Sequence, residues 1–305
     1  MRMLLLGGNG QVGHELRRSL APLGELVVAT RNGALPDGTA CEALDLAEPA
    51  AIEASIARIA PDVVVNAAAH TAVDRAEDER ELAFRINALA PGRIAEACAA
   101  RGAALVHYST DYVFDGSGDR PYREDDPTAP LGVYGASKLA GERAIAASGA
   151  RYLVLRTAWV YGLHGANFLR TMLRLGAERD ELGVVADQVG SPTPAWLIAD
   201  VTATILRQGV AGSGIRHLVS AGRTSWHGFA EAIFDEALAR GLLQRRPRVL
   251  PIGTAQFPTR ATRPAWSVLD TTALVADYGI ELPQWRQALQ RTLAPMAPSA
   301  GSAPA

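Results

Sequence analysis

The sequence predicts an α/β fold, a doubly wound parallel sheet with helices on both faces and a smaller, interleaved C-terminal region. Three observations predict it. Short apolar runs alternate with helical patterns up to about residue 160, a glycine-rich loop follows the first run, and proline and glycine interrupt the second half. The chain has 305 residues, 48% of them hydrophobic and 20% charged, which suits one large globular domain or two closely joined ones.

The first half alternates strand and helix candidates in order. The predicted strands are Met3–Leu6, Leu26–Ala29, Asp62–Asn66, Ala104–Ser109 and Tyr152–Thr157, and the predicted helices are Gln11–Ala21, Ala50–Ile59, 81–101 and Leu131–Ala147. Strands that are apolar throughout are buried on both faces, and a helix between two of them returns the chain so that they run parallel. In the second half, helical patterns cover Trp196–Arg207, Trp226–Arg240 and Gln284–Leu293.

The composition argues against several classes of protein. The net charge is −2 with no basic block, so we expect no nucleic-acid partner, and no apolar run is long enough to predict a membrane span. Cys41 and Cys98 form no CxxC motif, so we expect no disulfide framework and a cytoplasmic protein. The six histidines show neither HxxxH nor HExxH spacing, so the sequence predicts no zinc site.

A glycine-rich loop, residues 7–13, joins the first strand to the first helix. Gly7, Gly10 and Gly13 let the backbone turn sharply and approach a pyrophosphate, which binds the amides at the helix N-terminus. The loop therefore predicts a Rossmann-type, dinucleotide-binding domain over residues 1–160. We expect a substrate-binding region over 161–294, part of which returns to the main sheet, and a disordered tail over 295–305.

The end of the second strand bears on the choice of cofactor. A carboxylate there would favour NADH, but the strand ends at Arg31 with no acid, and a guanidinium can hold a 2′-phosphate. Arg31 thus favours NADPH over NADH, with a solvated surface arginine as the alternative. Asp45 either contacts the adenine or caps the helix that follows.

Lys138 is the only lysine among 30 basic residues, and it follows Tyr134 by four positions. On a helix these two side chains share a face. A free tyrosine has a pKa of about 10, which a neighbouring cation lowers. The spacing therefore predicts a proton-donating tyrosine with an assisting lysine.

Ser109 and Thr110 close the fourth predicted strand. Ligands of open parallel sheets bind at the carboxyl ends of the strands, so the Thr110 hydroxyl is placed to bind a substrate carbonyl oxygen as negative charge develops on it. An ordinary polar turn is the alternative.

Several ordered segments carry a family resemblance. GGNGQVG, VNAAAHTAVD, HYSTDYVFDG and VYGASKLAGE resemble the extended short-chain dehydrogenases/reductases that act on nucleotide sugars. RTAWVYG, DQVGSPT and TRPAWSVLDT extend the likeness from residue 1 to about 295 and are similar to the dTDP-4-dehydrorhamnose reductase family. The resemblance implies NAD(P)H-dependent reduction of the 4-keto group of dTDP-4-dehydro-β-L-rhamnose, the last step of dTDP-L-rhamnose synthesis.

The resemblance also implies roles for single residues. Tyr134 would protonate the sugar oxygen, and Thr110 would hydrogen-bond that oxygen. Asp111 would contact substrate, and Trp159 would lie against the sugar. Lys138 would bind the nicotinamide ribose and tune Tyr134.

Further positions follow from the same likeness. The implied cofactor-binding residues are Gly10, Gln11, Val12, Asp45, Leu46, Ala69, His70 and Thr71. Arg263 would hold a substrate phosphate, although Trp266 stands where the family has a small polar residue. Members bind magnesium at a dimer interface, so the likeness implies a homodimer and a Mg²⁺ ligand at Glu15, where His14 replaces a frequent aromatic residue.

Two other functions fit the same motifs. The first is a nucleotide-sugar epimerase or dehydratase that recycles bound NAD, which the Thr110-Asp111-Tyr112 order disfavours because dehydratases place an acid third. The second is a non-catalytic regulatory subunit of the same fold. The presence of Thr110, Tyr134 and Lys138 together favours an enzyme.

Overall fold

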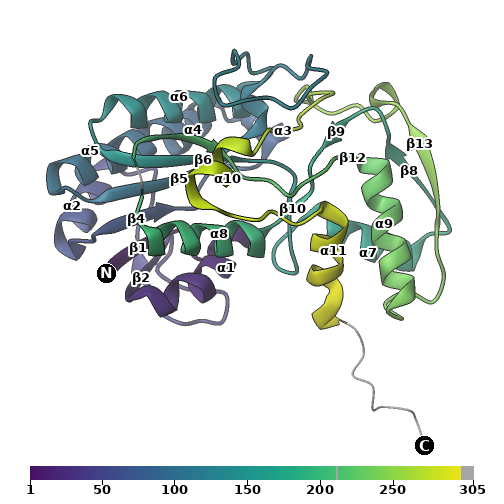
Figure 1. Cartoon of the computed structure of the whole chain (residues 1–305), viewed down its shortest axis with the longest axis horizontal. Coiled ribbons are helices and arrows are strands. Elements are labelled where there is room, and N and C mark those ends of the chain that lie inside the picture. Colours follow the sequence, from purple (N-terminus) through teal and green to yellow (C-terminus); the bar gives the residue numbers. More distant parts are fainter. Residues whose placement is uncertain (211, 297–305) are drawn as a thin grey trace, which may run out of the picture.

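The computed structural model describes residues 1–210 and 212–296, and its centre is a parallel sheet of seven strands (Figure 1). In spatial order the strands are β11 (Gly214–His217), β6 (Arg151–Thr157), β5 (Ala104–Thr110), β4 (Val63–Asn66), β1 (Arg2–Leu6), β2 (Glu25–Thr30) and β3 (Glu42–Ala43). All six pairings are parallel. The predicted α/β fold is therefore confirmed.

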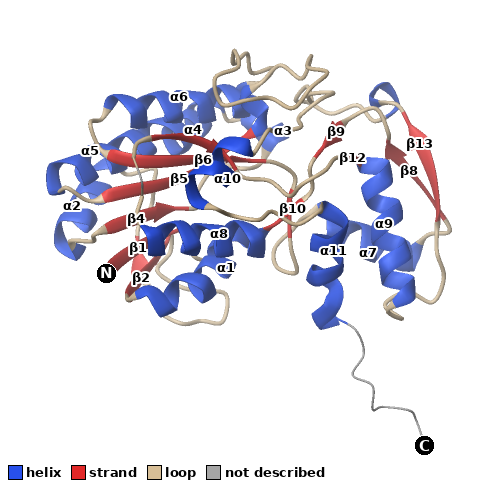
Figure 2. Ribbon diagram, viewed as in Figure 1, coloured by secondary structure: helices blue, strands red, loops and turns tan. Residues whose placement is uncertain are grey.

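Helices cover both faces of this sheet because its strands are apolar on both sides (Figure 2). Met3 and Leu5 of β1 contribute to one core, and Leu4 and Leu6 contribute to the other, as the two-residue period of a strand requires. The first core includes residues of α1 (Gln11–Leu20), α8 (Ala195–Gln208) and α10 (Thr272–Tyr278), and the second includes residues of α2 (Pro49–Ile59), α5 (Ala90–Arg101) and α6 (Val133–Ala147).

The helical stretch expected over 81–101 is broken into pieces. The helices α3 (Val73–Asp78) and α4 (Arg80–Phe84) precede a π-helical turn, Arg85–Leu89, and only then does α5 begin. Pro91 lies in the first turn of α5 and has no amide hydrogen to donate to the preceding turn. The regular ladder is interrupted there, and a π-turn accommodates the interruption.

The second half builds a smaller unit beside the sheet and also contributes to the sheet itself (Figure 1). Its core lies among α7 (Phe168–Glu178), α9 (Trp226–Ala239), α11 (Trp285–Leu293) and the parallel pair β8 (Glu181–Val185) and β13 (Arg248–Ile252). Two more short pairs are formed by β7 (Val160–Tyr161) with β10 (Thr193–Pro194) and by β9 (Val189–Gly190) with β12 (Thr224–Ser225). The sequence did not predict α7, β8 or β13.

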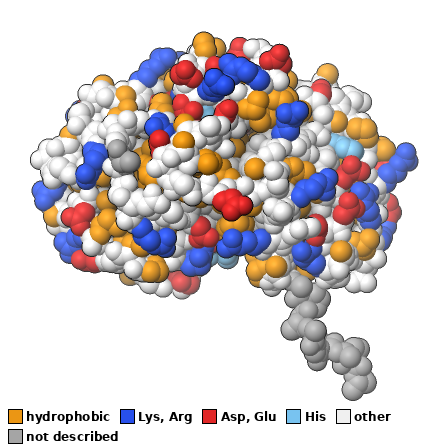
Figure 3. Space-filling view, in the orientation of Figure 1, with side chains coloured by type: hydrophobic (Ala, Val, Ile, Leu, Met, Phe, Trp, Pro, Cys, Tyr) orange, Lys and Arg blue, Asp and Glu red, His pale blue; other side chains and the backbone are white. Residues whose placement is uncertain are grey.

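The end of the chain partly meets expectation. Ala294–Met296 forms a 3₁₀ turn after α11, so the predicted tail, 295–305, starts inside a turn, and residues 297–305 lie outside the described part. Within the described residues, no helix is both long and apolar enough to cross a membrane. On the face shown in Figure 3, acidic and basic side chains are interspersed over the whole surface.

Candidate active site

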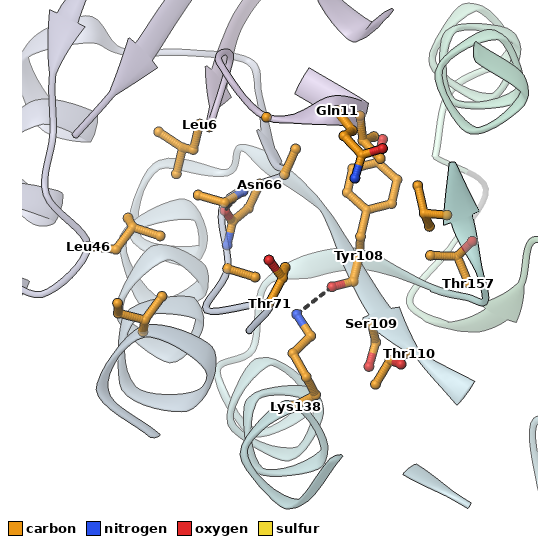
Figure 4. A pocket seen from close by; sticks show the side chains of 18 of the residues that line it. Leu6, Gln11, Leu46, Asn66, Thr71, Tyr108, Ser109, Thr110, Lys138 and Thr157 are labelled. Atoms are coloured by element: carbon orange, nitrogen blue, oxygen red, sulfur yellow. Dashed lines mark hydrogen bonds between the residues drawn. The ribbon is translucent and has the colours of Figure 1, made fainter. Parts of the chain in front are cut away.

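A cavity of about 690 Å³ opens at the carboxyl ends of the central strands (Figure 4). It brings together most of the residues singled out from the sequence. The predicted residues that line it are Gly7, Gly10, Gln11, Val12, Arg31, Asp45, Leu46, Ala69, Thr71, Thr110, Asp111, Tyr134, Lys138 and Trp159. His70, Arg263 and Glu15 do not line it.

The glycine loop forms one wall and fits a dinucleotide. Gly7 has a φ of +79°, and a Cβ there would lie 2.7 Å from the amide nitrogen of Ala68. A Cβ on Gly13 would lie 2.0 Å from the carbonyl oxygen of Gly7, so both positions exclude a side chain. Gly10 precedes α1 without a side-chain cap, which leaves the first-turn amides available to phosphate oxygens.

The adenosine end of the cavity is formed by Arg31 and Asp45. Arg31 is exposed and forms no ion pair with any described residue. The Asp45 carboxylate accepts a hydrogen bond from the Ala47 amide at 2.9 Å. It does not cap α2, because that helix begins at Pro49 with Glu48 at the N-cap position.

Lys138 reaches the cavity from α6 and is 2% exposed. Its Nζ donates to the carbonyl oxygen of Tyr108 at 2.6 Å, the dashed line in Figure 4, and lies 3.2 Å from His107 Nε2. Burial lowers the pKa of Lys138 to about 8, against an opposing effect of Glu142.

The partners of His107 act in the same direction as burial and disfavour the ammonium form of Lys138. The Asn66 side-chain oxygen accepts from the Ala68 amide at 3.1 Å, which orients the Asn66 Nδ2 towards His107 Nδ1, also at 3.1 Å. A neutral imidazole has one acceptor nitrogen, so Nε2 carries the proton in the tautomer assigned from these partners. That proton faces Lys138 Nζ, which accepts it only as an amine.

Tyr134 lies one turn before Lys138 on α6, in contact with Tyr112, whose ring meets it edge-on at a centroid distance of 5.6 Å. Burial raises the pKa of Tyr134 to about 12, with the Thr110 hydroxyl acting in the opposite direction. Lys138 was expected to lower the pKa of Tyr134, but in this structure its Nζ is directed to Tyr108 and His107 instead. Burial disfavours the phenolate and determines the direction of the shift. Tyr134 is therefore fully protonated at neutral pH.

Two buried oxygens in the cavity wall have no partner among the described residues. They are Asp111 Oδ2 and Thr157 Oγ1. The other Asp111 oxygen accepts from the Thr110 hydroxyl at 2.9 Å, and burial raises the pKa of Asp111 to about 6. Sequence reasoning missed Thr157, although its place at the end of β6 was the same signal that identified Thr110 on β5. Such orphaned oxygens suit a ligand rich in hydroxyl groups.

Trp159 forms the outer wall in an unusual backbone conformation. Its φ is +48°, a left-handed value that is rare for a bulky residue and that persists only where surrounding packing holds it. Its ring stacks on Trp226 with centroids 3.5 Å apart and planes 4° apart. The indole is thus held rigidly at the edge of the cavity.

Two predicted site residues make structural contacts outside the cavity. His70 Nε2 pairs with Glu79 at 2.8 Å, and His70 does not line the cofactor cavity. Arg263 pairs with Asp74 at 2.7 Å and does not line the cavity. Trp266 donates its indole N–H to the Arg120 carbonyl, a structural contact.

Glu15 lies in a cluster that does not suit magnesium. Donor atoms of His14, Glu15 and His164 all lie within 4.8 Å of one another. Mg²⁺ requires oxygen ligands in octahedral geometry, whereas two of these three donors are imidazole nitrogens. The Mg²⁺ site predicted at Glu15 is therefore not supported.

Comparisons with known proteins agree along the whole length of the chain. A family model described as the RmlD substrate binding domain matches residues 1–297. The dTDP-4-dehydrorhamnose reductase of Burkholderia thailandensis is 49% identical over 300 residues, covering 95% of this chain and 97% of the relative. That of Salmonella typhimurium is 44% identical, covering 97% and 98%.

A solved structure agrees with these relatives. The dTDP-4-dehydrorhamnose reductase of Bacillus anthracis, in complex with NADP, superposes with a TM-score of 0.86 at 35% identity, covering 96% of this chain and 98% of that one. The resemblance inferred from the motifs is confirmed. By its sequence, its fold and the cavity at the carboxyl ends of its strands, the chain belongs to the dTDP-4-dehydrorhamnose reductase family.

Proposed function

We propose that this chain reduces the 4-keto group of dTDP-4-dehydro-β-L-rhamnose with NADPH to form dTDP-L-rhamnose, the last step of that synthesis. One observation carries the proposal. Tyr134, Lys138 and Thr110 line the same cavity as the glycine loop, so a proton donor and a dinucleotide cradle face one space.

The reaction needs a hydride and a proton. When bound, the nicotinamide supplies hydride to carbon 4 of the sugar. Tyr134 donates the proton to the oxygen, and its raised pKa keeps the phenol protonated until charge develops on the substrate. Lys138 would bind the nicotinamide ribose and supply the proton that converts the phenolate back to the phenol, and its pKa of about 8 allows it to release a proton near neutral pH.

The sugar lies between polar and aromatic groups. Thr110 turns its hydroxyl from Asp111 to the substrate carbonyl oxygen and stabilises the charge that grows there. Asp111 Oδ2 and Thr157 Oγ1 bind sugar hydroxyls, which supplies the partners that both oxygens lack. Trp159 stacks on the apolar face of the ring.

Arg31 supports NADPH as the preferred cofactor, with NADH as a poorer one. Its unpaired guanidinium at the adenosine end of the cavity can bind a 2′-phosphate in bidentate fashion. The Bacillus anthracis relative is described in complex with NADP.

No observation favours an epimerase or dehydratase that recycles NAD. The position after Asp111 holds Tyr112, whose ring packs against Tyr134 and brings no acid to the sugar. The UDP-glucose 4-epimerase of Thermus thermophilus is 22% identical at a TM-score of 0.80, a likeness of fold alone.

The test compares the wild type with Tyr134→Phe in a spectrophotometric assay of NADPH or NADH oxidation by dTDP-4-dehydrorhamnose. We expect kcat to fall by about 10²- to 10⁴-fold while the Kd of NADPH is unchanged. Tyr152→Phe, which removes a hydroxyl on β6 outside the cavity, is the matched control. A wild type that is folded yet oxidises neither cofactor, or a Tyr134→Phe variant with full activity, contradicts the proposal.

The homodimer stays a prediction of the family resemblance. Sedimentation velocity of the full chain at micromolar concentration tests it, with a mass twice the 32.2 kDa of one chain expected.

A further inference from the structure

We propose that His14, Glu15 and His164 bind a divalent transition-metal ion of the Zn²⁺ class, and that this ion fastens the loop over residues 162–167 to helix α1 beside the dinucleotide cavity. The three donors come from two segments about 150 positions apart in the chain. His14 and Glu15 lie in the first half of α1, and His164 lies in the loop between β7 and α7.

The three donors lie near one another, and the two imidazole rings are in contact, so a side chain must rotate before one ion can bind all three donors. The donor atoms lie within 4.8 Å of one another, and the two imidazole rings have centroids 3.6 Å apart with planes tilted by 34°. Zn²⁺ binds nitrogen and carboxylate oxygen at about 2.0–2.2 Å, so tetrahedral donors lie about 3.3 Å apart. Because His164 is exposed on a loop, rotation of its side chain can close the difference. Water would complete the coordination, as in other open zinc sites.

The donor set also selects the class of ion. Imidazole nitrogens bind Zn²⁺, Ni²⁺ and Cu²⁺ well, whereas Mg²⁺ and Ca²⁺ require oxygen. The cluster contains a single carboxylate, so hard cations would gain one oxygen ligand from the described residues. The inference therefore replaces the magnesium implied by the family resemblance with an ion that suits the side chains present.

Arg17 competes with the ion for His14. One of its terminal nitrogens donates to His14 Nδ1 at 3.0 Å. A neutral imidazole offers one lone pair, so an ion on either ring nitrogen requires Arg17 to leave. The Arg17 side chain is incompletely held, because its Nε is buried without a hydrogen-bond partner among the described residues. Removing this guanidinium should therefore strengthen binding of the metal.

The loop already rests on α1 next to the cavity. Asn167 donates to the Gln11 side-chain oxygen at 2.9 Å, and the Gln11 amide donates to the Ala166 carbonyl at 3.3 Å. Both Gln11 and Ala166 line the cofactor cavity. An ion between His14 and His164 adds a further link between the same two segments, beyond these hydrogen bonds and the contact of the two imidazole rings, so it should slow dissociation of the dinucleotide. This effect on the cofactor rests on the proposed function, whereas the metal site itself does not.

The first experiment is calorimetric titration of Zn²⁺ alone into the full-length, tag-free, metal-free chain. We expect one site per chain, an affinity at least about tenfold weaker in His164→Ala, and a tighter site in Arg17→Ala. His227→Ala is the matched control, because His227 lies on α9 away from the cluster and should leave the affinity unchanged. Equal affinity in the wild type and in His164→Ala overturns the site, as does displacement of Zn²⁺ by equimolar Mg²⁺.

The second experiment measures the dissociation rate of NADPH with and without Zn²⁺, by fluorescence, in the wild type and in His164→Ala. We expect Zn²⁺ to slow dissociation in the wild type only. If Zn²⁺ binds and the rate is unchanged, the fastening role is overturned and the site stands. If NADPH binds to neither protein, the proposed function fails, while the Zn²⁺ titration still decides the site.

Discussion

Replacement of Lys138 by methionine tests how strongly the buried ammonium is destabilised. The pKa of Lys138 falls from its ordinary value of 10.5 to about 8 because the side chain is desolvated. One pH unit in a pKa corresponds to about 1.4 kcal/mol, so the charged form is disfavoured in the folded chain by about 3 kcal/mol. Methionine has a similar length and carries no charge to desolvate.

The sign of the pH dependence follows from linkage. Between pH 8 and 10.5 the unfolded chain keeps the lysine proton and the folded chain has lost it, so the stability of the wild type rises with pH in this window. Below pH 8 both states are protonated and the whole cost is present. Above pH 10.5 neither state is protonated and the cost is gone.

The assay is urea unfolding of the cofactor-free wild type and Lys138→Met at pH 7.5, 9 and 10.5. The difference in unfolding free energy, variant minus wild type, should fall by about 3 kcal/mol from the lowest to the highest pH. The hydrogen bond lost to the Tyr108 carbonyl adds an offset to this difference at every pH. A difference that stays flat with pH would show that Lys138 titrates normally and would refute the reasoning.

Two further predictions concern charges elsewhere in the chain. Arg31→Ala should raise the KM for NADPH by roughly 10- to 100-fold and leave the KM for NADH unchanged in steady-state assays, because a charge-assisted bond to the 2′-phosphate is worth about 1.5–3 kcal/mol; equal effects on both would remove Arg31 from cofactor selection. Glu142→Gln should lower the unfolding free energy in urea by about 3 kcal/mol, since it leaves Arg156, 3% exposed and paired at 2.7 Å, without a counter-ion. Glu178→Gln, in the exposed pair with Arg174, is the control and should cost under about 0.5 kcal/mol.

The strands, and the site residues at their carboxyl ends, could be predicted from the sequence because both depend on local patterns. β4 and β5 are buried at every position, and each begins with three consecutive apolar residues, Val63–Val65 and Ala104–Val106. Parallel strands end at one edge, so Thr110 and Trp159, after two different strands, had to face the glycine loop. These inferences used only the period of the chain and the direction of its strands.

The smaller unit in the second half of the chain lacked such clear sequence patterns. β8 contains Gly183, and β13 contains Pro251, which a two-stranded sheet tolerates because proline can lie at an edge. Helix α7 is amphipathic and capped by the Asn167 side chain, a signal that was present in the sequence and not used. Strands β8 and β13, by contrast, are stabilised by packing on α9, which no local sequence pattern reveals.

Contacts between residues far apart in the sequence were the other feature that could not be predicted. Arg263 is 189 positions from Asp74, with which it forms an ion pair, and it does not line the cavity, so its phosphate role stays a prediction. His70 is only nine positions from Glu79, yet the contact depends on the placement of helix α3 between them. The cluster of His14 with His164 was not predicted, because the spacing rules for zinc ligands describe residues that are close in sequence.

The two deeply buried cations explain why a chain so rich in arginine uses lysine at position 138. Arg156 is buried together with the Glu142 carboxylate, and it donates one charged hydrogen bond to each of the two carboxylate oxygens. The same two Glu142 oxygens are thereby occupied, so position 138 has only a carbonyl and a neutral imidazole as partners. Arginine cannot lose its proton in a protein and would remain an uncompensated charge there, whereas lysine can become an amine. Its ability to alternate between these forms is also what proton transfer through Tyr134 requires, so the environment that destabilises the ammonium suits the residue to the proposed reaction.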